Sequence, residues 1–255
     1  MKKLFIKIFS RIIPVKTLAM LELIFQKSLG KGISLSLVNE INSVRKFLKE
    51  DVDVIFDIGA NYGNYTDELL KHYPKAKYFL FEPGKVPYQH LLNKFKDYPN
   101  IKIFNNAVSD KNSTQPLYYD KKGSGLASLT KRKLDHFDIK FDEFEEVELI
   151  SLNTLFKDNF DNNSFRVNFC KIDIEGHELT VLHSIKKNYE KFSLIQFEFG
   201  GCNIDSRTYF QDFWYLLKDN FDIYRIGPSG PILIEKYSEI DESFVMTNYL
   251  AVNKN

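Results

Sequence analysis

VIFDIGANYGNYT, residues 54–66, combines a short apolar run with a loop that contains two glycines. The run covers residues 54–57 and ends in an acid, and a helix-like spacing of apolar residues follows over 65–73. Glycines let a backbone turn sharply and bring a ligand close to the main chain. The free N–H groups at the start of the next helix add a ligand-binding edge. The segment therefore predicts a strand, a binding loop and a helix, in that order.

The same alternation of strand and helix continues through the chain. Further predicted strands cover residues 78–81, 101–104, 166–173, 194–199, 221–226 and 249–253. Predicted helices cover residues 86–95, 178–187 and 210–218. Strands without polar alternation are buried on both sides, so the pattern favours an α/β fold with a mostly parallel sheet and helices on both faces. Ligands of such sheets bind beyond the carboxyl ends of the strands, where the motifs described below fall.

Residues 110–150 interrupt this alternation with a polar stretch. The stretch contains Gly123-Ser124-Gly125 and a strand-like alternation over 145–150, and a short helix is predicted to start over 151–156. We interpret it as an excursion of the chain over the active face rather than as a second domain. A solvated surface hairpin is the alternative.

The N-terminal part of the chain differs from the rest in charge. Residues 1–50 hold ten Lys or Arg and three acids, a balance of +7, whereas the remaining residues have a balance of −6. Apolar residues over 17–50 recur with a period near 3.6, and Gly30 and Gly32 divide that helical stretch. We predict an N-terminal helical segment over 1–50 and one α/β domain over 51–255.

Residues 1–16, MKKLFIKIFSRIIPVK, form a basic leader. As a helix ended by Pro14, the leader would carry its basic residues on one face and apolar residues on most of the remainder. Such a helix either lies on an anionic membrane surface or docks its apolar face on the domain. Lys7 and Arg11 interrupt the apolar run and no small-residue cleavage site follows closely, which argues against a secretory signal.

The composition excludes several classes of protein. The 255 residues are 44% hydrophobic and 27% charged, which is enough apolar material for a core and excludes a mainly disordered chain. Two cysteines, Cys170 and Cys202, rule out a disulfide scaffold and fit a reducing, cytoplasmic location. The sequence has no apolar run of the roughly 18 residues that a membrane span needs. The acidic balance of the main body argues against nucleic-acid binding.

The loop after the first strand predicts a cofactor site. Its pattern, D-x-G-x-N-x-G, lacks the G-x-G-x-x-G spacing of a dinucleotide site, because Asn61 stands where the second glycine would be. The acid suits a cationic ligand, and S-adenosylmethionine carries both an ammonium and a sulfonium. The candidate cofactor-binding residues in this loop are Asp57, Gly59, Ala60, Asn61, Gly63 and Tyr65. An ordinary turn between strand and helix is the alternative.

Two later strand ends extend the predicted cofactor site. Glu82 ends the second strand and could accept hydrogen bonds from both ribose hydroxyls of an adenosine. A surface acid before a turn would produce the same pattern. Asn106 and Ala107 follow the third strand, and small or apolar residues there would line an adenine pocket.

The densest polar cluster is KIDIEGHE, residues 171–178. Such crowding of charges at one strand end indicates a ligand. Lys171, Asp173 and Glu175 alternate along an extended chain, so we expect them to share a face. The candidate catalytic residues are His177 or Glu175 as general base, Asp173 as orienting residue and Lys171 beside them.

A divalent cation is not assigned by this pattern, although the cluster could hold one. Asp173 together with Glu175, or with His177, offers ligands of the kind that Mg²⁺ or Mn²⁺ prefers. The alternative is an acidic helix N-terminus, which explains Glu178 but not the other charges. Glu198, at the end of the fifth strand, is either a substrate or metal ligand or a structural hydrogen-bond acceptor.

Taken together, these motifs resemble the FkbM family of S-adenosylmethionine-dependent methyltransferases. The motifs are FDIGANYGNYT (56–66), FEP (81–83), NNAVSD (105–110), KIDIEGHE (171–178) and NYLAVNK (248–254). The resemblance implies a class I methyltransferase fold, a Rossmann-like, seven-stranded, mostly parallel sheet with one antiparallel strand near its C-terminal edge. The hairpin-like stretch 221–235 and the strand 249–253 would supply that edge.

The resemblance also implies roles for individual residues. The methionine part of the cofactor would contact Asp57, Gly59, Asn61 and Gly63. Glu82 would hold the ribose, and Asn106 and Ala107 would sit by the adenine. Residues 173–177 would face the reacting methyl group.

The resulting hypothesis is O-methylation of a sugar, a glycan or a related small molecule by in-line displacement. One alternative is a catalytically silent Rossmann-like module at the membrane surface. Another is an NAD-dependent oxidoreductase, which the missing pyrophosphate fingerprint disfavours. We expect a cytoplasmic protein, with peripheral contact to the inner face of a membrane through residues 1–16 as an open alternative. The acceptor, metal dependence and oligomeric state are not assigned by the sequence.

Overall fold

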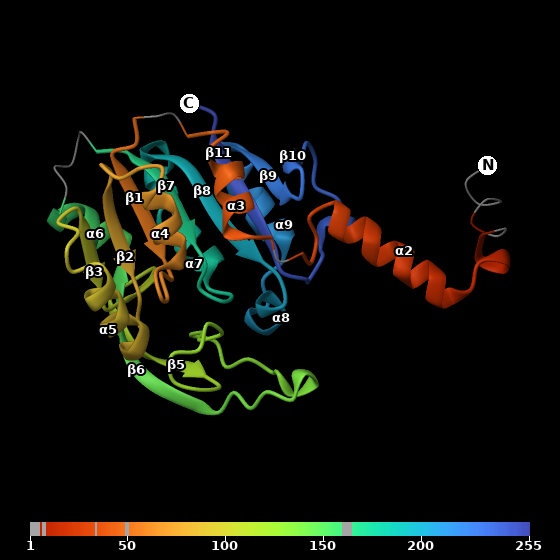
Figure 1. Ribbon diagram of the computed structural model, residues 1–255, viewed down its shortest axis with the longest axis horizontal. Helices are drawn as coiled ribbons and strands as arrows, with labels where there is room; N and C mark the ends of the chain where they lie inside the picture. Colours follow the sequence, from red (N-terminus) through yellow and green to blue (C-terminus); the bar gives the residue numbers. More distant parts are fainter. Residues whose placement is uncertain (1–5, 7–8, 34, 49–50, 160–164) are drawn as a thin grey trace.

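The computed structural model describes residues 6, 9–33, 35–48, 51–159 and 165–255 (Figure 1). The strands are β1 (Val54–Ile58), β2 (Lys77–Phe81), β3 (Ile101–Phe104), β4 (Ala107–Ser109), β5 (Ser113–Tyr119), β6 (Glu143–Ser151), β7 (Val167–Ile172), β8 (Phe192–Phe199), β9 (Phe221–Gly227), β10 (Gly230–Leu233) and β11 (Thr247–Asn253). The α-helices are α2 (Val15–Ser28), α3 (Leu37–Val44), α4 (Asn64–Leu70), α5 (Lys85–Lys94), α6 (Leu152–Asn159), α7 (Glu178–Ser184), α8 (Cys202–Ser206) and α9 (Phe210–Leu217). Short 3₁₀ helices are η1 (Asp135–Phe137), η2 (Lys186–Lys191) and η3 (Glu239–Asp241).

The main sheet has eight strands in the order β10-β9-β11-β8-β7-β1-β2-β3. Pairing is parallel from β8 through β7, β1 and β2 to β3. β11 runs antiparallel to both of its neighbours, β8 and β9. The class I methyltransferase fold expected from the sequence is thereby confirmed, with one addition. β10 folds back on β9 as an eighth strand where seven were expected, so the hairpin-like stretch forms a true hairpin.

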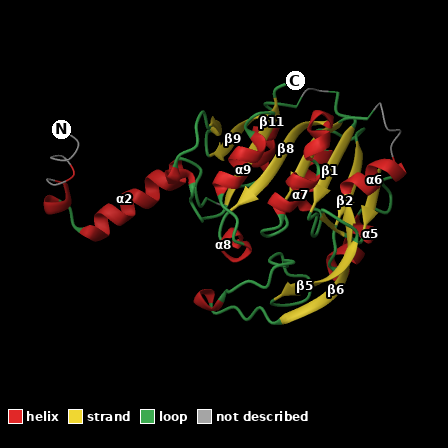
Figure 2. Ribbon diagram, turned by 180° about the vertical axis from the view of Figure 1, so that it is seen from behind, coloured by secondary structure: helices red, strands yellow, loops and turns green. Residues whose placement is uncertain are grey.

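Helices cover both faces of this sheet (Figure 2). On one face, α6, α7 and α9 pack around residues such as Phe56 and form the larger core. On the other face, α3, α4 and α5 pack around residues such as Ile55 and Leu80. Because the neighbours Ile55 and Phe56 are both fully buried, on opposite faces, the strand shows no polar alternation.

The excursion over residues 110–150 forms a small sheet of its own, in the order β4-β6-β5. β5 pairs antiparallel with β6, and β4 pairs parallel with it. Leu117, Val147 and Leu149 form a separate small core on this sheet. The sheet lies beyond the carboxyl ends of the parallel strands (Figure 1). This position agrees with the interpretation of residues 110–150 as an excursion over that face.

The N-terminal helices break between α2 and α3, as Gly30 and Gly32 predict. Ile41 and Val44 of α3 are fully buried in the core shared with the sheet. The domain boundary at residue 50 stays a prediction, although α3 packs as part of the main body. No helix in the described part of the chain is both long and apolar enough to cross a membrane.

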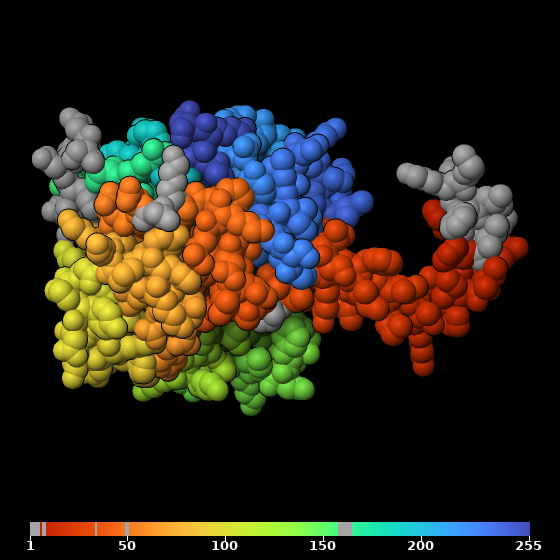
Figure 3. Space-filling view, turned by 45° about the horizontal axis from the view of Figure 1, so that its top comes forward, coloured from red at the N-terminus to blue at the C-terminus, as the bar shows by residue number. Residues whose placement is uncertain are grey.

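The described part of the leader does not dock on the domain. Residues 9–12 are helical, and Pro14 separates them from α2 as predicted. Ile6, Phe9 and Ile12 are exposed, and α2 extends away from the body (Figure 3). Docking of the apolar face, one of the two expected arrangements, is therefore not found. Residues 1–5 and 7–8 lie outside the described residues.

Candidate active site

A pocket lies between the carboxyl ends of β1, β2 and β7 and the excursion. It contains about 580 Å³ of empty space, part of it open to solvent. The predicted site residues that line it are Gly59, Asn61, Glu82, Asn106, Ala107, Asp173 and Glu175. From the excursion, the lining residues are Leu117, Ser124, Gly125, Ala127 and Leu129. Motifs that are far apart in the sequence therefore meet in one cavity.

The loop between β1 and α4 forms one wall of the pocket. Gly59 has φ +84°, and a Cβ atom there would lie 1.9 Å from the carbonyl oxygen of Asp173. Gly63 has φ +71° and precedes the first residue of α4. Asn61 has φ +49°, in the left-handed region that non-glycine residues rarely adopt. The glycine at position 59 is therefore required by close packing of the loop against the chain after β7.

Glu82 is buried at the end of β2. Its Oε1 accepts a hydrogen bond from Gly84 N and its Oε2 accepts one from Asn61 N, each at 2.8 Å. Burial raises the pKa of Glu82 to about 7, although these two hydrogen bonds act in the opposite direction. An ionised carboxylate has about four lone-pair sites. The backbone thus holds Glu82 at the pocket wall with acceptor capacity left for hydroxyl groups.

Asp57 lies behind the pocket lining and is fully buried. Its Oδ2 accepts a hydrogen bond from Thr66 Oγ1 at 2.6 Å, whereas its Oδ1 has no hydrogen-bond partner among the described residues. Burial raises the pKa of Asp57. Asn61 Oδ1, in the pocket wall, is a second buried acceptor for which the described residues supply no donor. Unpaired buried acceptors are costly, so a cationic ligand with N–H donors fits here, and S-adenosylmethionine has such a group.

Besides Asp57, three further predicted cofactor residues lie outside the lining, namely Ala60, Gly63 and Tyr65. The backbone N–H groups of Gly59 and Ala60 both donate to the carbonyl oxygen of Phe81, which ties the loop to β2. Tyr65 is buried in α4 and faces away from this wall toward β8, where its hydroxyl finds a partner. Direct contact of these three residues with the cofactor stays a prediction.

Asp173 lines the pocket, whereas Lys171 lies outside the lining. Lys171 Nζ forms a 2.8 Å ion pair with Asp173 Oδ2 and lies 5.1 Å from the centroid of the Tyr65 ring. Burial opposes the charge on Lys171, but the carboxylates of Asp173, Asp57 and Glu40 raise its pKa above the usual value. Lys171 is therefore a permanent cation that orients Asp173.

The expected shared face is confirmed for Lys171 and Asp173, which form an ion pair, but the expected extended chain is wrong at Glu175. β7 ends at Ile172, and the chain then turns through Glu175, with φ +55°, and Gly176, with φ +104°. Glu178 accepts hydrogen bonds from Ile174 N and Gly176 N and so stabilises this turn. The turn brings Glu175 into the pocket beside Asp173.

A buried polar network connects this site to the N-terminal helix α3. Gln196 Oε1 accepts a hydrogen bond from the Tyr65 hydroxyl at 2.6 Å. Gln196 Nε2 donates to Glu40 Oε2 at 3.1 Å and to Asn248 Oδ1 at 3.3 Å. Burial raises the pKa of Glu40, while Lys171 acts in the opposite direction. Neither Glu40 nor Gln196 belongs to a motif, so sequence reasoning missed both.

We expect Gln196→Leu to lower the free energy of unfolding by about 3 kcal/mol, because the change leaves two buried polar groups without partners. These groups are the Tyr65 hydroxyl and the Glu40 carboxylate. Denaturant unfolding measures the effect. The exposed Gln211→Leu is the matched control and should leave stability nearly unchanged. Equal stability of the two variants would contradict an energetic role of the network.

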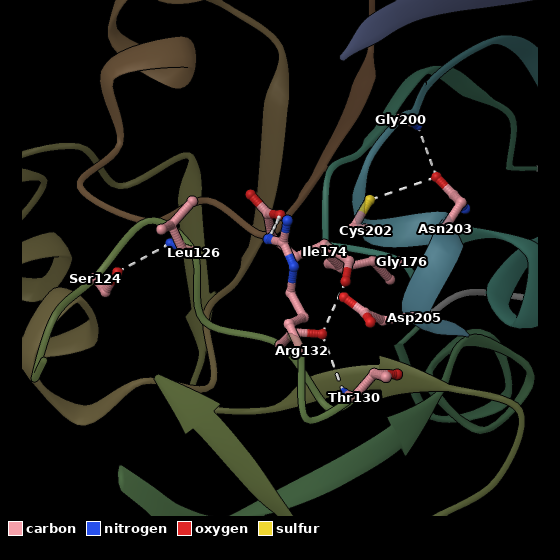
Figure 4. Close-up of polar contacts among 12 residues, drawn as sticks. Ser124, Leu126, Thr130, Arg132, Ile174, Gly176, Gly200, Cys202, Asn203 and Asp205 are labelled. Carbon is pink, nitrogen blue, oxygen red and sulfur yellow. Dashed lines mark hydrogen bonds and ion pairs between the residues drawn. The ribbon is translucent and has the colours of Figure 1, made fainter. Parts of the chain in front are cut away.

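Arg132 reaches from the excursion to the turn after β7 (Figure 4). Its Nη1 lies 2.5 Å from Glu175 Oε2, and Ser128 Oγ donates to the carbonyl oxygen of Glu175 at 2.8 Å. Burial and the neighbouring Asp173 raise the pKa of Glu175 to about 8, and Arg132 acts in the opposite direction. Sequence reasoning missed Arg132, and only its place in the excursion pointed to the site.

His177 lies outside the pocket lining. Its Nε2 is 3.0 Å from Ser109 Oγ, at the end of β4. Burial lowers its pKa, with Asp110 acting in the opposite direction, so the neutral form is favoured. The geometry favours Glu175 over His177 as the base, and the assignment itself stays a prediction.

One trio in the described part of the chain has the spacing of metal ligands. Candidate ligand atoms of Glu175, Glu198 and Cys202 all lie within 4.8 Å of one another. This is not the expected pairing of Asp173 with Glu175 or His177. Arg132 already places a cation on Glu175, and burial raises the pKa of the Cys202 thiol. The arrangement therefore assigns no metal.

The dependence of stability on pH follows from three carboxyl groups, of which Glu82 and Glu178 are buried and Glu175 is half-buried. The pKa is raised by burial to about 7 in Glu82 and Glu178 and to about 8 in Glu175. Folding then favours the protonated forms, so their contribution to stability is lost as the pH rises through the folded-state pKa values. We expect calorimetry to show a lower melting temperature at pH about 8.5 than at pH about 5.5.

Glu178→Gln removes one of these titrations and should flatten the dependence. The exposed Glu146→Gln is its control and should leave the slope unchanged. A melting temperature that rises with pH over this range would contradict the pKa directions given above.

Comparison with known proteins finds similarity over the part of the chain that contains most of these site residues. The sequence model of the family described as Methyltransferase FkbM domain matches residues 57–224. Methyltransferase sdnD of Sordaria araneosa is 27% identical over 158 residues, which cover 53% of this chain and 61% of that protein. The chain thus spans only about three-fifths of that relative's length.

Solved methyltransferase structures resemble the fold more distantly. An rRNA methylase from Streptococcus thermophilus has a TM-score of 0.45 at 10% identity, covering 88% of this chain and 99% of that one. TrmK of M. capricolum, solved with S-adenosyl-homocysteine, has a TM-score of 0.42 at 14% identity, covering 88% of this chain and 70% of that one.

Proposed function

Since the chain belongs to the FkbM methyltransferase family, we propose that it transfers the methyl group of S-adenosylmethionine to a hydroxyl group of a sugar, a glycan or a related small molecule. The membership confirms the resemblance that the motifs carry. It does not favour a nicotinamide-dependent oxidoreductase or a silent binding module. S-adenosylmethionine, when bound, supplies an electrophilic methyl group on a sulfonium.

The residues of the pocket divide into two groups in this proposal. Glu82 would accept hydrogen bonds from the ribose hydroxyls, and Asn106 and Ala107 would contact the adenine. Asp57 Oδ1 and Asn61 Oδ1, the buried acceptors without described partners, would take N–H groups of the methionine part. Asp173, fixed by Lys171, would orient that end of the cofactor.

The position of Glu175 is the observation that best supports a hydroxyl group as the methyl acceptor, because Glu175 could act as the general base. It lines the pocket beside Asp173, and its raised pKa suits a group that takes a proton near neutral pH. Arg132 contacts Oε2, so we assign proton acceptance to Oε1. Glu175 would take the proton of the acceptor hydroxyl, while the bound cofactor would supply the methyl group to that oxygen and leave as S-adenosylhomocysteine.

The surroundings of Glu175 support a hydroxyl-rich acceptor. Glu198 offers a second carboxylate close to Glu175, and Ser124 lines the pocket from the excursion. Several hydroxyl groups of one sugar could donate to such acceptors. An acidic surrounding of this kind disfavours an anionic group at the reacting position.

Product analysis tests the proposal. The full chain is incubated with S-adenosylmethionine and a panel of free sugars, glycosides, nucleotide sugars, amines and carboxylic acids. We expect S-adenosylhomocysteine release with a sugar and a methylated product that resists alkaline hydrolysis, as an ether does. An alkali-labile ester or a methylated amine as the product would overturn the assignment of a hydroxyl acceptor.

We also infer that the protein works in the cytoplasm. Cys170 and Cys202 are both free and buried, which suits a reducing compartment. Alkylation of both thiols after rapid denaturation of cells expressing the protein tests this. Recovery of an oxidised form would contradict it.

A further inference from the structure

Helix α2 exposes apolar side chains around its whole circumference. None of its 14 residues is buried. Its apolar residues are Val15, Leu18, Ala19, Met20, Leu21, Leu23, Ile24 and Phe25. A helix that is apolar all round is normally buried in a core or in lipid. In the described part of the chain no element of the main body covers it, and Figure 3 shows it standing clear of the body.

The base of α2 is fixed to the body. A Cβ atom at Gly30, which has φ +80°, would lie 2.5 Å from the carbonyl oxygen of Ile226, so the chain passes close against the end of β9. Gly32 N donates to the carbonyl oxygen of Met246 at 3.1 Å, and Lys31 Nζ donates to the carbonyl oxygen of Ile240. The turn after α2 is therefore anchored, and α2 projects from a defined point.

The helical turn before α2 adds to the same exposed surface. Ile6, Phe9 and Ile12 are exposed there, and a shallow groove lined by Ile6, Phe9, Ser10 and Leu18 joins the two helical pieces. We call α2 with residues 9–12 the N-terminal arm. Large exposed apolar surfaces mark sites of interaction with a partner or a membrane.

The positive charge of this region favours an anionic lipid surface over a second copy of the arm as the binding partner. Residues 1–31 contain seven Lys or Arg and one acid, Glu22. Arg11, Lys16 and Lys27 are exposed among the apolar side chains of the arm. A second copy of the arm would bring like charges together, whereas an anionic lipid surface attracts them and accepts the apolar side chains.

We propose that the N-terminal arm inserts its apolar side chains into an anionic lipid bilayer and holds the enzyme at the membrane surface. The main body, with its net negative balance, stays in water. Each exposed Lys or Arg adds electrostatic attraction within about one Debye length of the surface, so binding weakens as salt rises. This inference is independent of the identity of the acceptor.

Vesicle flotation of the full chain tests the proposal. We expect most of the protein to float with phosphatidylcholine vesicles that contain one-third phosphatidylglycerol, and little with phosphatidylcholine alone. Ile24→Gln with Phe25→Gln should lower the partition coefficient about tenfold or more. Lys16→Gln with Lys27→Gln should lower it by a similar factor on anionic vesicles only.

Matched variants on the body serve as controls. Ile240→Gln with Phe137→Gln changes apolar side chains that are at least as exposed as those of Ile24 and Phe25. Lys75→Gln with Lys187→Gln removes two exposed charges. Because α2 has no buried residue, its variants should keep the native melting curve. Failure to float with anionic vesicles overturns the proposal, as do control variants that lower binding equally. A dimer in light scattering that the Ile24 and Phe25 changes abolish, without vesicle binding, would assign the arm to a second copy instead.

Discussion

Replacing Glu82 by alanine is expected to weaken binding of S-adenosylmethionine at least about a hundredfold, because two hydrogen bonds to a charged group are lost together. The change also frees Asn61 N and Gly84 N, which Glu82 holds in the present structure. Isothermal titration calorimetry with S-adenosylmethionine and S-adenosylhomocysteine measures the loss. Both ligands should be affected equally, since both carry the ribose.

Two further variants make this result specific. Glu82→Gln keeps a hydrogen-bond acceptor but loses the charge, so its affinity should lie between those of the native protein and Glu82→Ala. Glu146→Ala removes an exposed carboxylate of β6 and should bind as the native protein does. Native affinity in Glu82→Ala, with an unchanged melting curve, would place the ribose elsewhere in the pocket.

Glu175→Gln is expected to lower kcat by a factor of about 10² to 10⁴, the usual contribution of a general base. The KM for S-adenosylmethionine should change little, because Glu175 faces the acceptor side in the proposed arrangement. In the native enzyme kcat should rise with pH and reach half of its plateau near pH 8, where half of Glu175 is ionised. The variant should lose this rise.

His177→Gln separates the two candidate bases. A glutamine can retain a hydrogen bond with Ser109, so this variant should keep most of the native turnover. A large loss of kcat in His177→Gln, together with a native pH profile in Glu175→Gln, would assign the base to His177. Steady-state kinetics with the acceptor found by product analysis supplies both comparisons.

Most of the fold could be predicted because its core is buried on both sides of the sheet. Runs such as residues 54–56 and 78–81 are apolar without alternation, and they lie in central strands. β4 could not be predicted, because three residues carry no periodic pattern. The four residues of β10 include Gly230 and Pro231 and have little strand propensity of their own. They form a strand because they pair with β9.

The candidate site could be predicted only where its residues follow strands in recognisable motifs. Glu82 and Asp173 stand at strand ends, and the order of parallel strands brings them together. Arg132 and Glu40 reach the site from an irregular segment and from a helix outside the motifs. Their positions depend on how those elements pack, which local sequence does not encode.

The place of β11 in the sheet has a consequence for how the chain folds during synthesis. β11 lies between β8 and β9, although it follows both in the sequence. Until residues 247–253 have left the ribosome, β8 and β9 have no partner on their facing edges, and apolar side chains of the larger core remain uncovered. A nascent chain in that state presents an open sheet edge that favours aggregation. β11 therefore closes two sheet edges at once when it inserts between β8 and β9.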